Sequence, residues 1–320
     1  MYQRFLPARR TCLLIGVLAV NLTTGMLRAD ETPTVVEPPA ELREQFQLKP
    51  FYRKCVVLGG FPIVSSEKVS DFALLEAADV VNHMLAGRDD VRQAMVKNKV
   101  RLAVMACTEL TCDVPEHSDL KPPAYWNRRA RGLGATHVRP AVSCGEENVL
   151  GLAGDPYSTE SILVHEFAHA IHEMGLNTVD PTFDQRLKGI YRQAMDEGLW
   201  KGKYAATNHH EYWAEGVQSW FGTNREDDHD HNHVNTRDEL KEYDPRLAKL
   251  IEESFPNNNW QYLRPDKRPA ESLHLTGFDR AKAPKFAWPP EVIKAWDEHQ
   301  AKKKRDDAKT NETRSQENQP

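Results

Sequence analysis

Apolar residues recur along the chain at helical spacing in some segments and as short continuous runs in others, which predicts a mixed α+β fold. Amphipathic periodicity predicts helices over 70–86, 89–97, 183–197 and 239–255, the last one broken at Pro245. Apolar runs predict short strands at 55–58 and 63–64, around Gly59 and Gly60, and a strand buried on both faces at 100–106. Residues 113–136 read as a long ordered loop, 137–152 as the source of an edge strand, and the proline-rich chain after Pro256 as a surface wrap.

One further helix, expected from about Glu160 or Ser161 to Gly175, has two chemically different sides. A core-facing stripe is formed by Leu163, Phe167, Ala170, Ile171 and Met174. The other flank carries His165, Glu166, His169 and His172. Gly175 is a natural stop signal for such a helix. A helix with merely hydrogen-bonded histidines would leave this gathering of His and Glu on one flank unexplained.

The stretch His165-Glu166-Phe167-Ala168-His169 is an H-E-x-x-H signature. Histidines four residues apart on a helix project from one face and can bind a single Zn²⁺, while the glutamate between them can deprotonate a water. A catalytic zinc needs a third protein ligand and one open position. For His172 we expect a hydrogen-bonded helix histidine, with a position facing the cleft as the alternative.

Glu211 is the candidate third ligand, on a second helix that Asn208 would cap. Glu215 lies one turn further along the same face, where it could accept the free N–H of a ligating histidine. Two alternatives remain open from these residues. Glu211 could serve only in a capping box with Asn208, or Glu215 could be the ligand while Glu211 caps.

Together, His165-Glu-Phe-Ala-His169 and the segment from Tyr204 to Glu211-Tyr-Trp-Ala-Glu215 resemble the gluzincin metallopeptidases. The similarity spans about residues 160–222 and is greatest to the branch with the anthrax lethal factor catalytic domain and the Pro-Pro endopeptidases. It implies a zincin-like α+β domain with a small mixed sheet and two zinc-bearing helices. It also implies one Zn²⁺ held by His165, His169 and Glu211, Tyr204 stabilising the oxyanion, and a protein or peptide substrate.

The two ends of the chain differ in composition from the middle. Arg4, Arg9 and Arg10 precede a short apolar run, which predicts a secretory signal peptide over 1–29, cleaved after Ala29, with an uncleaved anchor as the alternative. We expect a linker over 30–49, the catalytic domain over 50–298 and a disordered polar tail over 299–320. The mature protein is then secreted or periplasmic, without stable membrane insertion.

Charge and cysteine content fit export. Cleavage after Ala29 would remove four arginines and no acids, so the formal charge would go from −5 to −9, which argues against a nucleic-acid partner. The remaining cysteines are Cys55, Cys107, Cys112 and Cys144. An even number in an oxidising compartment predicts two disulfides, 107–112 and 55–144, with free buried thiols as the alternative.

These observations predict an exported zinc metallopeptidase in which Glu166 is the general base. The alternative is a non-catalytic extracellular binding or inhibitory module that keeps the zincin scaffold and its zinc. A metal-buffering role for the histidines within 228–233 is a third possibility, although that stretch reads more readily as a solvated polar loop.

Overall fold

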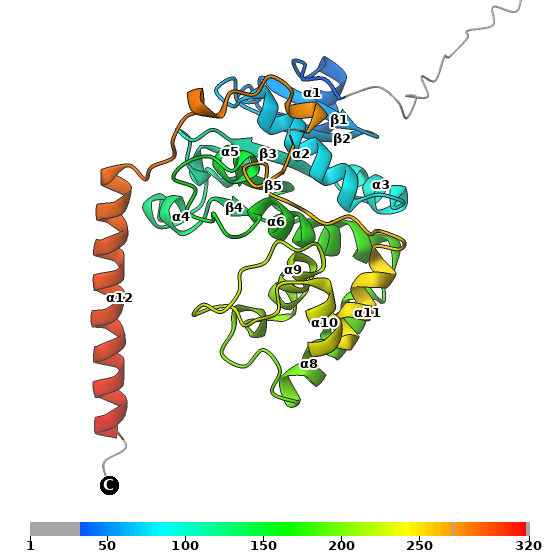
Figure 1. Cartoon of the computed structure of the whole chain (residues 1–320). Coiled ribbons are helices and arrows are strands. Elements are labelled where there is room, and N and C mark those ends of the chain that lie inside the picture. The colour runs from blue at the N-terminus through cyan, green and yellow to red at the C-terminus, as the bar shows by residue number, and fades with distance from the viewer. Residues whose placement is uncertain (1–32, 271, 318–320) are drawn as a thin grey trace, which may run out of the picture. The chain divides into compact units, whose positions relative to one another are not determined.

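A five-stranded mixed sheet organises the fold, as seen in a computed structural model that describes residues 33–270 and 272–317 (Figure 1). Its strands are β1 (Lys54–Leu58), β2 (Phe61–Ser65), β3 (Arg101–Met105), β4 (Gly132–Leu133) and β5 (Ala141–Gly145), in the order β1-β2-β3-β5-β4. β1 and β2 form an antiparallel hairpin, β2, β3 and β5 run parallel, and β4 is an antiparallel edge strand beside β5. The predicted α+β class is therefore confirmed.

Local sequence explains the hairpin and the central strand. Gly59 and Gly60 both have positive φ values, 53° and 87°, as a two-residue turn between twisted antiparallel strands requires. All five residues of β3 are buried, in agreement with the strand predicted at 100–106. β5 lies between β3 and β4, so the predicted edge strand within 137–152 is wrong: the edge strand comes from the segment that was expected to be a loop.

α-Helices make up much of the described structure outside the sheet. They are α1 (Ala40–Phe46), α2 (Asp71–Met84), α3 (Asp89–Lys97), α4 (Pro123–Arg129), α5 (Glu146–Leu150), α6 (Ile162–Ala170), α7 (Asn177–Val179), α8 (Phe183–Asp196), α9 (His209–Trp220), α10 (Arg237–Tyr243), α11 (Pro245–Ser254) and α12 (Pro290–Glu317). A π-helical turn, η3 (Ile171–Leu176), follows α6 directly. The predicted break at Pro245 is confirmed, because that proline begins α11. Among the described residues, no helix has the length and apolar character to cross a bilayer.

The two faces of the sheet pack against different helices, because successive strand residues point to opposite faces. One face carries Val56, Ile63, Leu102, Val104, Val142 and Cys144. It packs in one core cluster with residues of α2, α3, α6 and α9. The opposite face, which includes Val64 and Ala103, packs against Leu42 and Phe46 of α1. This arrangement, with a small mixed sheet above α6 and α9, agrees with the expected zincin-like fold (Figure 1).

The described part of the predicted linker, 33–49, is packed rather than extended. Val36 forms an isolated antiparallel bridge with Cys55, with N–O distances of 2.9 and 2.7 Å. Leu42 and Phe46 are buried. Two apolar residues at helical i, i+4 spacing are enough to bury one face of a short helix. The prolines and acidic residues around them are more typical of a linker, which is why the sequence did not predict this helix.

At the other end of the chain, α12 runs to Glu317 where composition predicts disorder from residue 299. The residues concerned are mostly Ala, Lys, Arg, Glu and Gln, which are strong helix formers, so a polar composition does not exclude a helix. The predicted signal peptide, residues 1–29, lies outside the described residues.

All four cysteines of the described chain are free thiols, so the predicted disulfides are absent from the structure. Cys55 lies on β1 and Cys144 on β5, with β2 and β3 between them. Neighbouring strands are about 4.8 Å apart, which places these two residues roughly 14 Å apart, whereas a disulfide needs Cα atoms closer than about 7 Å. Cys107 and Cys112 lie close in sequence, but Cys107 is buried, whereas Cys112 is partly exposed and its Sγ lies 3.9 Å from the Pro123 carbonyl.

Residues 256–289 form a strap that joins α2 to the end of α9. Its Asn258 Nδ2 donates to the carbonyl of His83 on α2 at 2.7 Å, and the backbone N–H of Tyr262 donates to the carbonyl of Phe221 at 2.9 Å. Arg268 pairs with the buried carboxylate of Glu76, also on α2. The predicted surface wrap after Pro256 is therefore confirmed.

Candidate metal centre

Helix α6 presents two histidines one turn apart. Its N-cap is Ser161, whose Oγ accepts a hydrogen bond from the Val164 backbone N–H at 3.3 Å, so the predicted start is confirmed. The apolar stripe of this helix lies in the core, with Phe167 and Ala170 fully buried. That packing holds His165 and His169 toward α9. The predicted stop at Gly175 is wrong, because the chain continues through η3 and α7.

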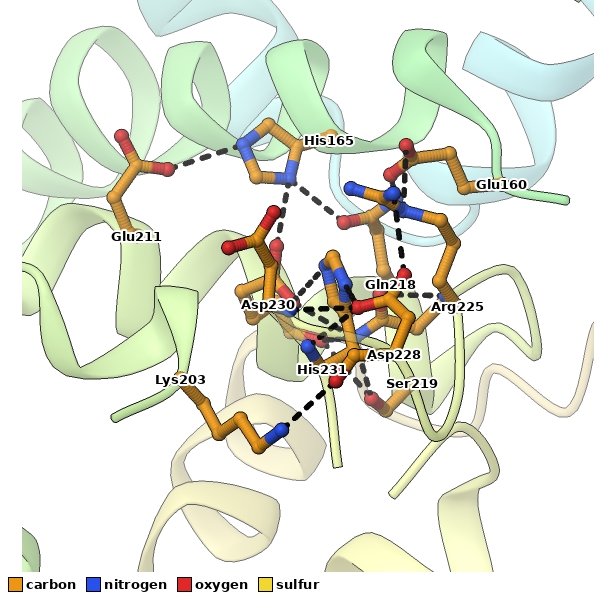
Figure 2. Close-up of polar contacts among 12 residues, drawn as sticks. Glu160, His165, Lys203, Glu211, Gln218, Ser219, Arg225, Asp228, Asp230 and His231 are labelled. Atoms are coloured by element: carbon orange, nitrogen blue, oxygen red, sulfur yellow. Dashed lines mark hydrogen bonds and ion pairs between the residues drawn. The ribbon is translucent and has the colours of Figure 1, made fainter. Parts of the chain in front are cut away.

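Helix α9 brings a carboxylate to the same place. Asn208 is its N-cap, and Asn208 Oδ1 accepts hydrogen bonds from the backbone N–H groups of His210 and Glu211 at 2.8 and 3.0 Å. The Glu211 side chain points toward His165 (Figure 2), and its Oε2 lies 3.3 Å from His169 Nε2. A hydrogen bond links α9 to α6, in which the indole N–H of Trp213 donates to the Ala168 carbonyl at 2.9 Å.

The three candidate ligand atoms form a nearly equilateral triangle. His165 Nε2 lies 3.1 Å from Glu211 Oε2 and 3.2 Å from His169 Nε2, and the third side, His169 Nε2 to Glu211 Oε2, is 3.3 Å. Zinc bonds to nitrogen and oxygen are about 2.0–2.2 Å long, so tetrahedral coordination separates neighbouring ligands by roughly 3.3–3.6 Å. The three sides lie at or just below this range, so a small outward movement of the side chains would admit one Zn²⁺ and leave a fourth position open.

The charges around the triangle also suit a dication. Burial opposes the ionised form of Glu211, but hydrogen bonds from His165 and His169 outweigh it and hold the pKa of this carboxyl well below its usual range. Burial likewise opposes a charged His165, yet Glu211, Glu166 and Glu215 together raise the pKa of its imidazole to about 10. The site thus holds surplus negative charge that a proton, or a metal cation, can balance.

On its other ring nitrogen, His165 is oriented by Gln218. His165 Nδ1 lies 2.7 Å from Gln218 Oε1. The Gln218 amide nitrogen donates to the Ser161 carbonyl at 3.3 Å, which leaves its oxygen for the histidine. Since an amide oxygen only accepts, Nδ1 carries the proton, and Nε2 is the nitrogen directed at the other two ligand atoms.

Glu215, expected to take this hydrogen bond, lies slightly further away. Its Oε1 is 3.5 Å from His165 Nδ1, and its Oε2 accepts from Asn224 Nδ2 at 3.0 Å. The same Oε2 is 3.3 Å from Nε2 of His231, whose Nδ1 is 2.8 Å from Asp228 Oδ1. Figure 2 shows His231 and Asp228 of this network beneath His165. Glu215 therefore links the candidate ligand to the loop around residue 230.

The sequence predicts that the histidine-rich loop over 228–233 is solvated, but only part of this loop is exposed in the structure. His231 is buried, with 4% of its surface exposed, whereas the side chain of His229 is 96% exposed. Of these two histidines, only His231 lines the cleft. Sequence reasoning missed both His231 and Gln218. Gln218 could have been found, because it lies seven residues after Glu211 and so on the same helix face. His231 reaches the site through tertiary packing and leaves no local signal.

Glu166 and Tyr204 face a common cleft of about 640 Å³ that also includes His165 and Glu211. Burial raises the pKa of the Glu166 carboxyl, against the opposing effect of His165 and His169. Burial and the charge of Glu211 raise the pKa of the Tyr204 phenol, which Arg129 partly opposes, so the phenol keeps its proton. The structure thus brings every residue of the predicted site into one place.

Two glycines let the edge strand and the residue after it approach α6 closely. A Cβ on Gly132 would lie 2.4 Å from Ile162 Cγ2 and 3.0 Å from Glu166 Cγ. A Cβ on Gly134 would lie 2.9 Å from the Cβ of His169. The backbone of β4 therefore forms one wall of the cleft, directly beside the candidate ligands.

No known protein-family model matches the chain, and no curated protein does. Among solved structures, the Pro-Pro endopeptidase PPEP-2 from Paenibacillus alvei is similar with a TM-score of 0.33 and 16% sequence identity. That alignment covers 60% of this chain and 96% of the other.

Proposed function

We propose that the protein is a zinc-dependent metallopeptidase of the gluzincin type. The observation that carries this proposal is the triangle of His165, His169 and Glu211 atoms, with sides of 3.1–3.3 Å, in the same cleft as Glu166 and Tyr204. A purely structural zinc site has four protein ligands and no need of a free carboxylate beside it.

Each residue of the cleft has a role in peptide hydrolysis. A zinc ion held by the triangle would supply a positive charge that polarises a carbonyl and acidifies a water. Glu166 accepts the proton of the attacking water and passes it to the leaving amine. The Tyr204 hydroxyl donates a hydrogen bond to the oxygen that gains negative charge, a contribution typically worth about 3–4 kcal/mol. Gln218 and Glu215 keep the ring of His165 in orientation.

The substrate we propose is a protein or peptide that binds along β4. A backbone strand can add to a sheet edge, and β4 has a free side because it pairs only with β5 among the described strands. The N-terminal segment supports a further part of the proposal, namely that the enzyme acts after secretion or in the periplasm.

Replacing Glu166 with Gln tests the mechanism. The variant should retain one zinc per chain, because Glu166 is not a ligand, and should lose about 10²–10⁴-fold in turnover with the general base gone. The measurement is cleavage of a peptide library by the purified protein, read by mass spectrometry, together with elemental analysis for zinc. Glu226→Gln, the same change at an exposed loop position, is the matched control and should cleave normally.

Two results would count against the enzyme. Full activity of Glu166→Gln on a substrate cleaved by the unaltered protein would exclude Glu166 as the base. Stoichiometric zinc with no cleavage of any library peptide by the unaltered protein would favour the non-catalytic binding module.

A further inference from the structure

A second group of potential metal ligands lies one turn beyond the first. It consists of His172 and Glu173 on η3 and His210 near the start of α9, and one ligand atom from each lies within 4.8 Å of the others. These residues flank the proposed zinc ligands in sequence, but they belong to a different cluster of atoms. π-Helical turns such as η3 are rare and occur frequently at functional sites.

His172 is the unusual member of this group. Its side chain is completely buried, and neither of its ring nitrogens has a hydrogen-bond partner in the described structure. A buried polar group left without a partner destabilises the folded protein. In a neutral imidazole one of the two nitrogens carries a free lone pair that can bind a metal ion.

The surroundings of His172 give its two nitrogens different neighbours. Nδ1 lies 3.8 Å from Glu173 Oε1, which is itself 2.5 Å from His210 Nδ1. Nε2 lies 3.3 Å from Asp184 Oδ1. Nδ1 thus faces the other two candidate ligands, as in a metal-bound histidine, while Nε2 lies beside a carboxylate without forming a hydrogen bond to it.

An ordinary ion pair explains only part of the group. Glu173 Oε1 and His210 Nδ1 are 2.5 Å apart, so these two residues could be satisfied by a shared proton alone. That account leaves His172 without a partner at either nitrogen. Asp184 also contacts Lys188 Nζ at 2.6 Å and His209 Nε2 at 3.1 Å, so its own charge is already paired.

We propose that His172, Glu173 and His210 bind a second metal ion, a divalent transition metal of the zinc class. Two imidazoles and a carboxylate are the donor set that such ions prefer. Glu173 and His210 are partly exposed, with 31% and 40% of their side-chain surface accessible, which gives an ion a way in. The bound ion would join η3 to the first turn of α9, immediately before Glu211. This site does not depend on the peptidase activity proposed above.

Metal stoichiometry tests the proposal. The purified protein, freed of metal with a chelator, is titrated with Co²⁺ and with Zn²⁺ alone, and bound metal is counted by elemental analysis after dialysis. The unaltered protein should bind two ions per chain. The double variant Glu173→Gln/His210→Ala should bind one and keep the proposed peptidase activity. His209→Ala is the matched control, because it removes the neighbouring histidine that contacts Asp184, and it should still bind two.

His165→Ala/His169→Ala separates the two sites, since it should lose the first ion and keep the second. The second site would be overturned if the unaltered protein bound one ion per chain that was lost in His165→Ala/His169→Ala and kept in Glu173→Gln/His210→Ala. It would also be overturned if Glu173→Gln/His210→Ala still bound two ions per chain. A single ion lost only in Glu173→Gln/His210→Ala would support this site and reject the metal centre on which the peptidase proposal rests.

Discussion

Glu211 and Glu215 are one turn apart on α9, yet they meet opposite sides of the same imidazole. Glu211 Oε2 is close to both His165 Nε2 and His169 Nε2, and 18% of its side chain is exposed to the cleft. Glu215 is nearly buried, with 4% of its side chain exposed, and faces His165 Nδ1 together with His231. Under the proposed zinc site, this difference in depth would make Glu211 the metal ligand and Glu215 the residue that supports a ligating histidine.

This difference predicts an order of effects on zinc binding. Glu215→Ala should weaken zinc affinity by about 10–100-fold, the usual cost of losing a contact to a ligating histidine. Glu211→Ala removes a charged ligand and should weaken affinity further than that. Competition with a chromophoric chelator gives both dissociation constants. A larger loss in Glu215→Ala would reverse the two roles and remove the basis for placing Tyr204 beside the oxyanion.

At the residue scale, sequence reasoning could find what local spacing encodes. His165, Glu166 and His169 belong to one helical turn, and Asn208 with Glu211 marks the start of another. It could not find His231, because the contact between this loop residue and Glu215 depends on how the loop folds back over α9. Neither could it exclude a disulfide between Cys55 and Cys144, because that requires the order of the strands.

At the scale of elements, Gly175 has a packing role rather than the role of a helix stop. A Cβ at this position would lie 2.6 Å from Val91 Cγ1 of α3, so the absence of a side chain lets η3 and α3 approach closely. Periodicity predicted both helices, but not that they cross at this point. The segment 33–49 and strand β4 were missed for a similar reason, since only their packing partners make them regular.

Two glycine-to-alanine changes should therefore shift stability in opposite directions. Gly175→Ala should lower the free energy of unfolding by about 1–3 kcal/mol, the usual cost of overpacking. Gly189→Ala, in the interior of α8 with nothing within 4 Å of the new Cβ, should raise it by about 0.5–1 kcal/mol through helix propensity. Urea unfolding of the two variants measures both changes. Equal effects would show that the approach of α3 does not constrain η3.

On the scale of the whole molecule, buried histidines make stability depend on pH. His117 is 1% exposed, and its Nε2 lies 3.1 Å from Ser143 Oγ on β5. Burial lowers the pKa of this imidazole from the ordinary 6.5 to about 4. Between these values the unfolded chain binds a proton that the folded protein does not. The free energy of unfolding therefore falls as the pH falls from 6.5 to 4.

The contribution of His117 to this fall should reach about 3 kcal/mol. His117→Gln should flatten the pH dependence by up to that amount, and urea unfolding of the metal-free protein at several pH values between 6.5 and 4 measures it. Working without metal keeps protonation of the ligand histidines from adding to the slope through zinc release. Parallel curves for the variant and the unaltered protein would contradict the assignment.

The strap formed by residues 256–289 has a consequence for the order of events during synthesis. Helices α6 and α9 and the whole sheet leave the ribosome before the strap does, because they precede it in the chain. Until Asn258 and Arg268 reach α2, and Tyr262 reaches the end of α9, the contacts by which the strap joins these helices are missing. A nascent chain would therefore carry His165, His169 and Glu211 while still lacking the contacts of the strap. A peptidase built in this way would become competent only near its release, when little of its own chain is still unfolded and open to cleavage.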